Sequence, residues 1–177
     1  MVVLTKIISV NCGHTRSGAG YGAVSGRYKE SEITRQVGTE LIKLLKKKGH
    51  RVYNSTVDKA DSQNSYLKKV VQLANNSGAD LFISLHCNAS ATHQGHGSEC
   101  WTYKGKRVKE AVNICVELNK LGFRDRGIKD GQKFYVVKHT KMPAVLVEMF
   151  FLDNETDQDV YKKINAKKIA EAIANAI

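Results

Sequence analysis

The 177-residue sequence contains only one proline, and it lacks the features that divide a chain or place it in a membrane. It has no repeat at solenoid spacing, no low-complexity tract and no linker-like segment, so we expect a single domain over residues 1–177. None of its apolar runs approaches the length of a membrane-spanning helix. Its opening residues, MVVLTKIISV, lack the charged head, long apolar centre and cleavage site of a signal peptide. We therefore expect synthesis and folding in the cytoplasm.

The sequence also lacks paired cysteines at CxxC spacing. Its four cysteines are Cys12, Cys87, Cys100 and Cys115. Their spacing argues against a structural zinc knot and a disulfide framework, and in a reducing cytosol we expect four free thiols. Cys12 and Cys87 lie beside the candidate site described below, where they could act as minor metal ligands or as oxidation-prone neighbours.

Acidic residues are scarce relative to basic ones. The chain has 28 Lys and Arg against 17 Asp and Glu, for a net charge of +11. Solvated helix faces account for many of these residues, but a surplus of this size attracts polyanions. Nucleic acid, an anionic membrane or an anionic bacterial wall would each fit such a surface.

The pattern of apolar residues predicts an α/β fold. Strands are expected at 6–10, 51–54, 81–85, 98–103, 134–138 and 144–147. Helices are expected at 30–48, around 66–74, and at 108–121, 154–163 and 165–177. The first half of the chain therefore has the order βαβαβ, which favours a parallel sheet with right-handed crossovers.

Three of the apolar strands lead into side chains that can bind a metal. His14 follows the first strand, and His86 follows the segment LFISL. Glu148 follows AVLV, and Glu30 opens a helix that leads away from the same edge. Because the carboxyl ends of parallel strands meet at one rim, we expect these four side chains to converge. Two imidazoles and a carboxylate suit a catalytic zinc, and a second carboxylate could then take a proton from its water.

Each of these residues also has a structural interpretation. Glu30 could be a first-turn acid that the helix dipole favours. Glu148 would need a buried partner, because burying an unpaired carboxylate is costly. His50 is interpreted as a helix-end cation, and His93, His96 and His139 are interpreted as loop residues.

The glycine-rich segment from Arg16 to Arg27 does not predict nucleotide binding. Its GxG steps are not followed by a helix at the required offset, and no acidic residue closes a second strand. We therefore exclude a dinucleotide fingerprint at this segment.

Six segments carry a resemblance that covers nearly the whole chain. They are NCGHT, GRYKE ahead of a helix ending KKKGHRV, ADLFISLHCNAS, GHGSE, RDRGIKD and HTKMPAVLVEMFFLDNETD. In this order they resemble the zinc-dependent N-acetylmuramoyl-L-alanine amidases of the amidase-3 family. The likeness is closest to the catalytic domains of phage endolysins of clostridial type.

The resemblance implies a fold and a site. The fold would be a single α/β domain with a twisted, mostly parallel six-stranded sheet and helices on both faces. One Zn²⁺ per chain would be held by His14, Glu30 and His86, and Glu148 would be the catalytic glutamate.

The resemblance also implies a reaction and a place of action. The enzyme would hydrolyse the amide between N-acetylmuramic acid and L-alanine in peptidoglycan. It would act at the bacterial cell wall after release from the cytoplasm, and its positive charge would hold it near anionic wall polymers. A wall-binding domain beyond Ile177 would be common in the family.

The sequence departs from the family pattern near the proposed ligands. Asn11-Cys12 stand where Asp-Pro or Asp-Ala is common, and Thr15 replaces a glycine. Thr34 stands in place of an asparagine, and Glu30 is preferred to Glu32 because of its distance from Gly49. These changes remove no donor atom, so they bear on metal affinity and not on the reaction class.

Two alternative functions stay open at this point. A zinc peptidase that cuts peptide bonds of the peptidoglycan stem would use the same donor set. A non-enzymatic, basic nucleic-acid-binding domain would explain the charge but not the donors at the strand ends. The sequence has no helix-turn-helix, RNP or zinc-finger signature, so we expect no nucleic acid partner. Nothing in it predicts an oligomeric state.

Overall fold

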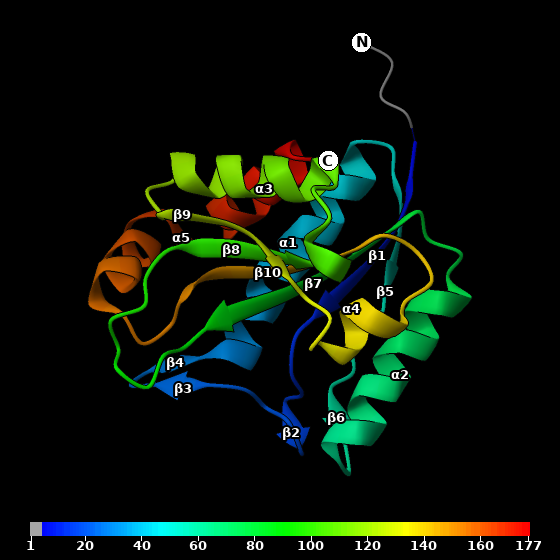
Figure 1. Ribbon diagram of the computed structural model, residues 1–177, viewed down its shortest axis with the longest axis horizontal. Coiled ribbons are helices and arrows are strands. Elements are labelled where there is room, and N and C mark those ends of the chain that lie inside the picture. The colour runs from blue at the N-terminus through cyan, green and yellow to red at the C-terminus, as the bar shows by residue number, and fades with distance from the viewer. Residues whose placement is uncertain (1–4) are drawn as a thin grey trace.

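The computed structural model describes residues 5–177, and a six-stranded sheet runs through its centre (Figure 1). The first four residues of the MVVLTKIISV opening lie outside the described part of the chain. The strand order is β5-β1-β7-β10-β8-β9. In chain order the strands are β1 (Ile7–Cys12), β5 (Arg51–Asn54), β7 (Leu81–Asn88), β8 (Ser98–Thr102), β9 (Asp125–Asp130) and β10 (Ala144–Phe151).

The sheet is mostly parallel, as expected from the sequence. Strands β5, β1, β7 and β10 run in one direction, β8 pairs with β10 antiparallel, and β9 is parallel to β8. The inner strands β1, β7 and β10 are almost entirely buried, which explains their continuous apolar runs. The polar residues that interrupt these runs near the carboxyl ends therefore share one rim of the sheet.

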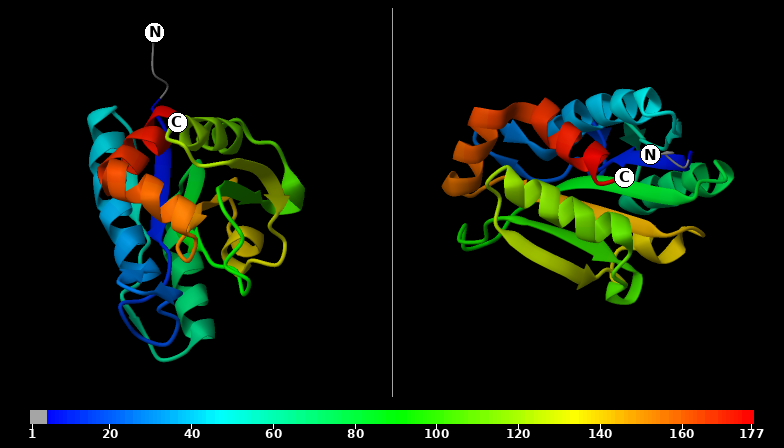
Figure 2. Two further views of the ribbon diagram at one scale, coloured as in Figure 1. Left: turned by 90° about the vertical axis from the view of Figure 1, so that its left-hand side faces the viewer. Right: turned by 90° about the horizontal axis from the view of Figure 1, so that it is seen from above.

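Helices cover both faces of the sheet, which confirms the predicted α/β class. One face packs against α1 (Glu30–Lys47), α3 (Lys109–Lys120) and α5 (Glu155–Asn175). Figure 2 shows α1 and α5 lying side by side on this face. The other face packs against α2 (Gln63–Asn76) and the short α4 (Tyr135–His139). The site described below lies at the rim formed by the carboxyl ends of the parallel strands β1, β7 and β10.

Two helix boundaries follow from local side-chain contacts. Ser62 precedes α2, and its hydroxyl accepts a hydrogen bond from the backbone N–H of Ser65. Asn165 interrupts α5 with φ 62°, and its side chain accepts from the N–H of Lys167. The predicted division into helices 154–163 and 165–177 therefore corresponds to a break inside one element.

Short ladders organise the segment that follows β1. Strand β2 (Ser17–Gly18) pairs with β6 (Lys59–Ala60), and β3 (Val24–Ser25) pairs with β4 (Tyr28–Lys29). A 3-10 turn, Tyr103–Gly105, follows β8. These ladders bring the glycine-rich segment against the start of α1.

The predicted strand at 134–138 is wrong, and the sixth strand is β9. Residues Tyr135–His139 form α4, because Val136 and Val137 bury their side chains against α2 and the sheet. Their β-branched and aromatic composition favours a strand, so tertiary packing overrides the local preference. Strand β9, with sequence DRGIKD, is a half-exposed edge strand without an apolar run, which explains why periodicity did not predict it.

Within residues 5–177, none of the helices has the length and apolar character needed to cross a lipid bilayer.

Gly38 in the interior of α1 gives a test of this packing. An alanine there would ordinarily stabilise a helix by about 1 kcal/mol. However, an added Cβ would overlap the sulfur of Cys12. We expect Gly38→Ala to lower the free energy of unfolding by about 1–3 kcal/mol, as measured by chemical denaturation.

A second background serves as the control for this substitution. In a Cys12→Ala protein the overlap is absent, so adding Gly38→Ala should raise stability relative to Cys12→Ala alone. Equal stability of Gly38→Ala and the native protein would contradict the contact between α1 and β1.

Candidate metal centre and active site

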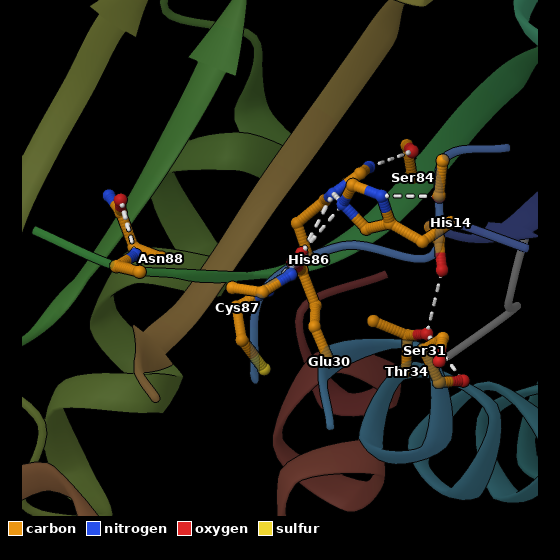
Figure 3. Close-up of polar contacts among 12 residues, drawn as sticks. His14, Glu30, Ser31, Thr34, Ser84, His86, Cys87 and Asn88 are labelled. Atoms are coloured by element: carbon orange, nitrogen blue, oxygen red, sulfur yellow. Dashed lines mark hydrogen bonds and ion pairs between the residues drawn. The ribbon is translucent and has the colours of Figure 1, made fainter. Parts of the chain in front are cut away.

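Three of the predicted residues meet at the carboxyl rim of the sheet (Figure 3). His14 lies two residues beyond β1, Glu30 is the first residue of α1, and His86 lies in β7. One ligand atom from each lies within 4.8 Å of the others. Glu30 Oε1 is 3.1 Å from both His14 Nε2 and His86 Nδ1, and these two ring nitrogens are 3.2 Å apart.

Hydrogen bonds on the outer nitrogens fix the tautomers of both imidazoles. His14 Nδ1 lies 2.9 Å from the carbonyl oxygen of Gly20, which can only accept, so Nδ1 carries the proton. Ser84 donates its hydroxyl proton to Asn11 Oδ1 at 2.8 Å, so its oxygen accepts from His86 Nε2 at 3.1 Å. Asn11, at a departure from the family pattern, thus completes a relay that orients His86.

This arrangement leaves two ring lone pairs and a carboxylate directed at one point. Unprotonated His14 Nε2 and His86 Nδ1 face each other at 3.2 Å, which is unfavourable unless a proton or a cation lies between them. Two imidazole nitrogens and one carboxylate oxygen are a donor set that suits zinc. The three residues therefore fit a small cation such as Zn²⁺, which they would hold.

The backbone also holds the Glu30 carboxylate in place. Its two oxygens accept from the N–H groups of Ala23 and Cys87, each at 3.0 Å. Burial opposes its ionisation, but the adjoining residues His14 and His86 outweigh burial and hold the pKa of Glu30 well below its usual range. Burial lowers the pKa of His86, and Glu30 raises the pKa of His14 against the effect of burial. An ionised carboxylate beside a neutral His86 is the state that metal binding requires.

Two glycines allow the three ligands to come this close. A Cβ at Gly13 would collide with the His86 ring and with the carbonyl oxygen of Leu85. A Cβ at Gly22, which has φ +80°, would collide with Glu30 Oε2 and the His14 ring. The sequence showed glycines near the site, but it could not show which of them contact the ligands.

Arg35 and Thr34 on α1 hold the loop that carries His14, a role that no local pattern in the sequence indicates. His14 has φ 68°, an uncommon conformation for a residue with a side chain. The Arg35 guanidinium donates to the His14 carbonyl at 2.8 Å and pairs with Asp58 at 2.8 Å. Thr34 donates to the Gly13 carbonyl at 3.0 Å. The threonine that departs from the family pattern thus still anchors this loop.

Glu148 lies beside the metal-binding group, in β10. In the sheet register it is the partner of His86 on β7 and of Glu99 on β8. Its Oε2 is buried and has no hydrogen-bond partner among residues 5–177. Burial, together with the charges of Glu30 and Glu99, raises the pKa of Glu148 well above its usual range, with Lys133 opposing the shift. A carboxyl group of this kind is suited to accepting and returning a proton.

A second carboxylate, Glu99 of the GHGSE segment, lies opposite Glu148 in the sheet register, and no pattern in the sequence indicates this pairing. Its Oε1 accepts from the Asn88 amide at 3.0 Å, and its Oε2 pairs with Arg126 at 2.8 Å. Since both oxygens have partners, Glu99 is fixed, whereas Glu148 keeps an unpaired oxygen. The ion pair between Arg126 and Glu99 connects the RDRGIKD segment, which contains β9, with the predicted site.

The cysteines beside the site do not join the metal-binding group. Figure 3 shows the sulfur of Cys87 pointing away from the two imidazoles. The sulfur of Cys12 faces Gly38 on α1. Burial raises the pKa of both thiols, so neither is set up as a thiolate ligand. The group that could hold a metal within the described chain consists of His14, Glu30 and His86.

The remaining candidates lie elsewhere. Glu32, the alternative to Glu30, is exposed and pairs with Lys29 at 3.2 Å. His50 accepts from the N–H of Lys6 at 3.2 Å, and His93 pairs with Asp153 at 2.7 Å. The choice of Glu30 over Glu32 therefore agrees with the geometry of the site.

Comparison with known proteins extends these observations. Residues 8–177 match the Amidase_3 family, described as N-acetylmuramoyl-L-alanine amidase. The uncharacterised protein CPE1502 of Clostridium perfringens strain 13 is 34% identical over 175 residues, covering 96% of this chain and 51% of that protein. N-acetylmuramoyl-L-alanine amidase LytC of Bacillus subtilis strain 168 is 32% identical over 178 residues, covering 97% of this chain and 34% of LytC. The chain thus spans about half the length of one relative and a third of the other.

A solved structure gives the same result for the fold. The catalytic domain of an endolysin targeting Clostridia Difficile aligns with a TM-score of 0.85 and 31% sequence identity. The alignment covers 97% of this chain and 96% of that domain. The family match over residues 8–177 and the shared fold lead to one conclusion: the chain belongs to the N-acetylmuramoyl-L-alanine amidase family.

Proposed function

We propose that this chain hydrolyses the amide between N-acetylmuramic acid and L-alanine in peptidoglycan, using one Zn²⁺ held by His14, Glu30 and His86. The observation that carries the proposal is the approach of His14 Nε2 and His86 Nδ1 to 3.2 Å, beside the buried, unpaired Glu148 oxygen. Family membership supports the choice of bond. The chain spans only part of the length of these relatives. Their activity is therefore assigned to this chain only as a proposal.

The residues of the site divide the work of amide hydrolysis. A zinc ion supplies Lewis-acid polarisation of the scissile carbonyl and lowers the pKa of water. Glu148 accepts a proton from the attacking water at Oε2 and passes it to the nitrogen of the departing L-alanine. Its raised pKa suits the first step, because a carboxylate with a raised pKa binds a proton more readily than an ordinary one.

A basic groove near the site supports action at an anionic cell wall. The groove has a volume of about 1510 Å³ and lies between the glycine-rich segment, α1 and α5. Six basic and two acidic side chains line it, together with Tyr21, Tyr28 and Tyr161. Arg27 and Lys167 are exposed there and are in no ion pair within residues 5–177. In our proposal this groove binds the phosphate groups of anionic wall polymers.

Product analysis tests the bond that is cleaved. After digestion of purified peptidoglycan, mass spectrometry should find muramic acid with a free lactyl carboxylate and peptides that begin with L-alanine. Labelling of new amino termini should yield alanine. Fragments in which the sugar stays attached to L-alanine while the stem peptide is shortened would support the peptidase alternative instead.

Two substitutions should separate metal binding from proton transfer. His86→Ala removes a donor, so we expect loss of most of the bound zinc and of wall lysis. Glu148→Gln keeps the metal-binding group intact, so it should retain about one zinc per chain and lose lysis by at least about 100-fold. Zinc content by mass spectrometry and turbidity loss of purified walls are the measurements.

Glu155→Gln is the matched control, since it changes an exposed glutamate of α5 that lines neither the metal-binding group nor the basic groove. It should keep native zinc content and lysis. A Glu148→Gln protein that lyses walls at the native rate would exclude Glu148 from proton transfer.

Charge removal in the basic groove tests polymer binding. We expect Arg27→Ser with Lys167→Ser to weaken binding to poly(glycerol phosphate) about tenfold at low salt. Added salt should reduce the binding of the native protein. Lys138→Ser with Lys141→Ser removes the same charge from the other face of the sheet and should have little effect. An equal loss of polymer binding in the two double variants would show that only the net charge of the protein matters.

A further inference from the structure

Lys133 packs over Trp101 of β8, the strand beside the one that carries Glu148, and neither metal binding nor proton transfer explains it. It occupies the connection between β9 and α4 and is exposed. Its ammonium group lies 4.1 Å from the centre of the Trp101 ring and 5.0 Å from that of Phe134. The two rings pack edge to face, with their centres 5.1 Å apart. Two aromatic faces therefore hold a single cation at a defined place.

This place lies on the β8 side of Glu148. Trp101 on β8 is the register partner of Leu146, which precedes Glu148 by two residues in β10. Side chains two residues apart in a strand share a face, so Trp101, Glu99 and Glu148 face the same side of the sheet. Strand β10 lies between β8 and β7, and His86 is on β7. Glu148 is thus flanked by the metal-binding group on one side and by Lys133 on the other.

The charges around Lys133 leave its ammonium group available. Arg126, the other cation at this part of the rim, is already paired with Glu99 at 2.8 Å. Lys133, in contrast, forms no ion pair with an acidic side chain within residues 5–177. An exposed cation that is held by aromatic rings and has no acidic partner is preorganised for an anion from outside the chain.

We infer that Lys133 binds a carboxylate of the peptide stem, on the leaving-group side of Glu148. The inference rests on the proposed function, in which the departing L-alanine nitrogen takes its proton from Glu148. Two residues of strand separate Glu148 from the level of Trp101, a distance of about 7 Å. An extended peptide covers this distance in two residues, which places the α-carboxylate of the second stem residue near Lys133.

The experiment compares two synthetic muramoyl tripeptides, both amidated at the C-terminus. They differ only at the second residue, a glutamate joined to the third residue through its side-chain carboxyl, so that its α-carboxyl group is either a free carboxylate or a carboxamide. For the native, zinc-loaded protein we expect a KM about fivefold lower for the carboxylate form. Lys133→Met keeps an apolar side chain on the rings but removes the charge, so it should abolish this preference. Lys133→Arg should restore it, and Lys138→Met on α4 should leave it unchanged.

The ratio between the two substrates separates this role from an indirect one. Lys133 also acts on the pKa of Glu148, so its loss could change kcat. Such an effect would be the same for both tripeptides and would leave the KM ratio unchanged. A native protein without a preference, or a Lys133→Met protein that keeps it, would overturn the inference.

A binding measurement distinguishes failure of this inference from failure of the proposed function. Calorimetry with the free stem tripeptides, in carboxylate and carboxamide forms, requires no catalysis. Tighter binding of the carboxylate form by the native protein but not by Lys133→Met would support the subsite, even if neither muramoyl compound were cleaved. Equal affinities of the native protein for the two peptides would refute the subsite, whatever the activity.

Discussion

The close approach of two imidazole nitrogens to one carboxylate oxygen is the interaction on which the structure of this site depends. His14 Nε2 and His86 Nδ1 are 3.2 Å apart, and each lies 3.1 Å from Glu30 Oε1. Such a group is favourable only when positive charge lies among its lone pairs. The surrounding structure fixes it in this state through Gly20 and Ser84, which orient the rings, and through backbone N–H groups, which hold the carboxylate.

The sheet topology explains how distant parts of the chain reach this point. His14, Glu30 and His86 come from the ends or beginnings of elements that meet at one rim, because β1 and β7 are adjacent and parallel. Glu148 enters from β10, the next strand in the sheet. The reversal of direction at β8 then brings Glu99 directly opposite Glu148. Burial, together with the like charges of Glu30 and Glu99, raises the pKa of Glu148, whose Oε2 has no hydrogen-bond partner in the described chain.

The parts of the fold that the sequence could predict are those with strong local signals. Buried parallel strands have continuous apolar runs, so β1, β7 and β10 were found, and the residues at their ends indicated the rim. Strand β9 has no such signal, and the valines of α4 have a strand-like composition. Both errors concern the β8 to β10 region, where tertiary contacts determine the structure.

The residues of the site were likewise predictable in part from the sequence. The residue types that could bind a metal were visible in the sequence, and the structure brings His14, Glu30 and His86 together. Contacts between segments far apart in the sequence were not visible, because no local pattern encodes them. These include Arg35 against the His14 loop, Gly22 against Glu30, and Arg126 against Glu99.

X-ray absorption at the zinc edge of the zinc-loaded protein tests the central claim most directly, because it measures the ligand atoms themselves. The account predicts only nitrogen and oxygen neighbours at about 2.0–2.2 Å, with scattering from two imidazole rings. His86→Ala should remove one of the two imidazole contributions from any zinc that still binds. A sulfur neighbour at about 2.3 Å would contradict the account, because it would place Cys12 or Cys87 at the metal in place of the predicted donors.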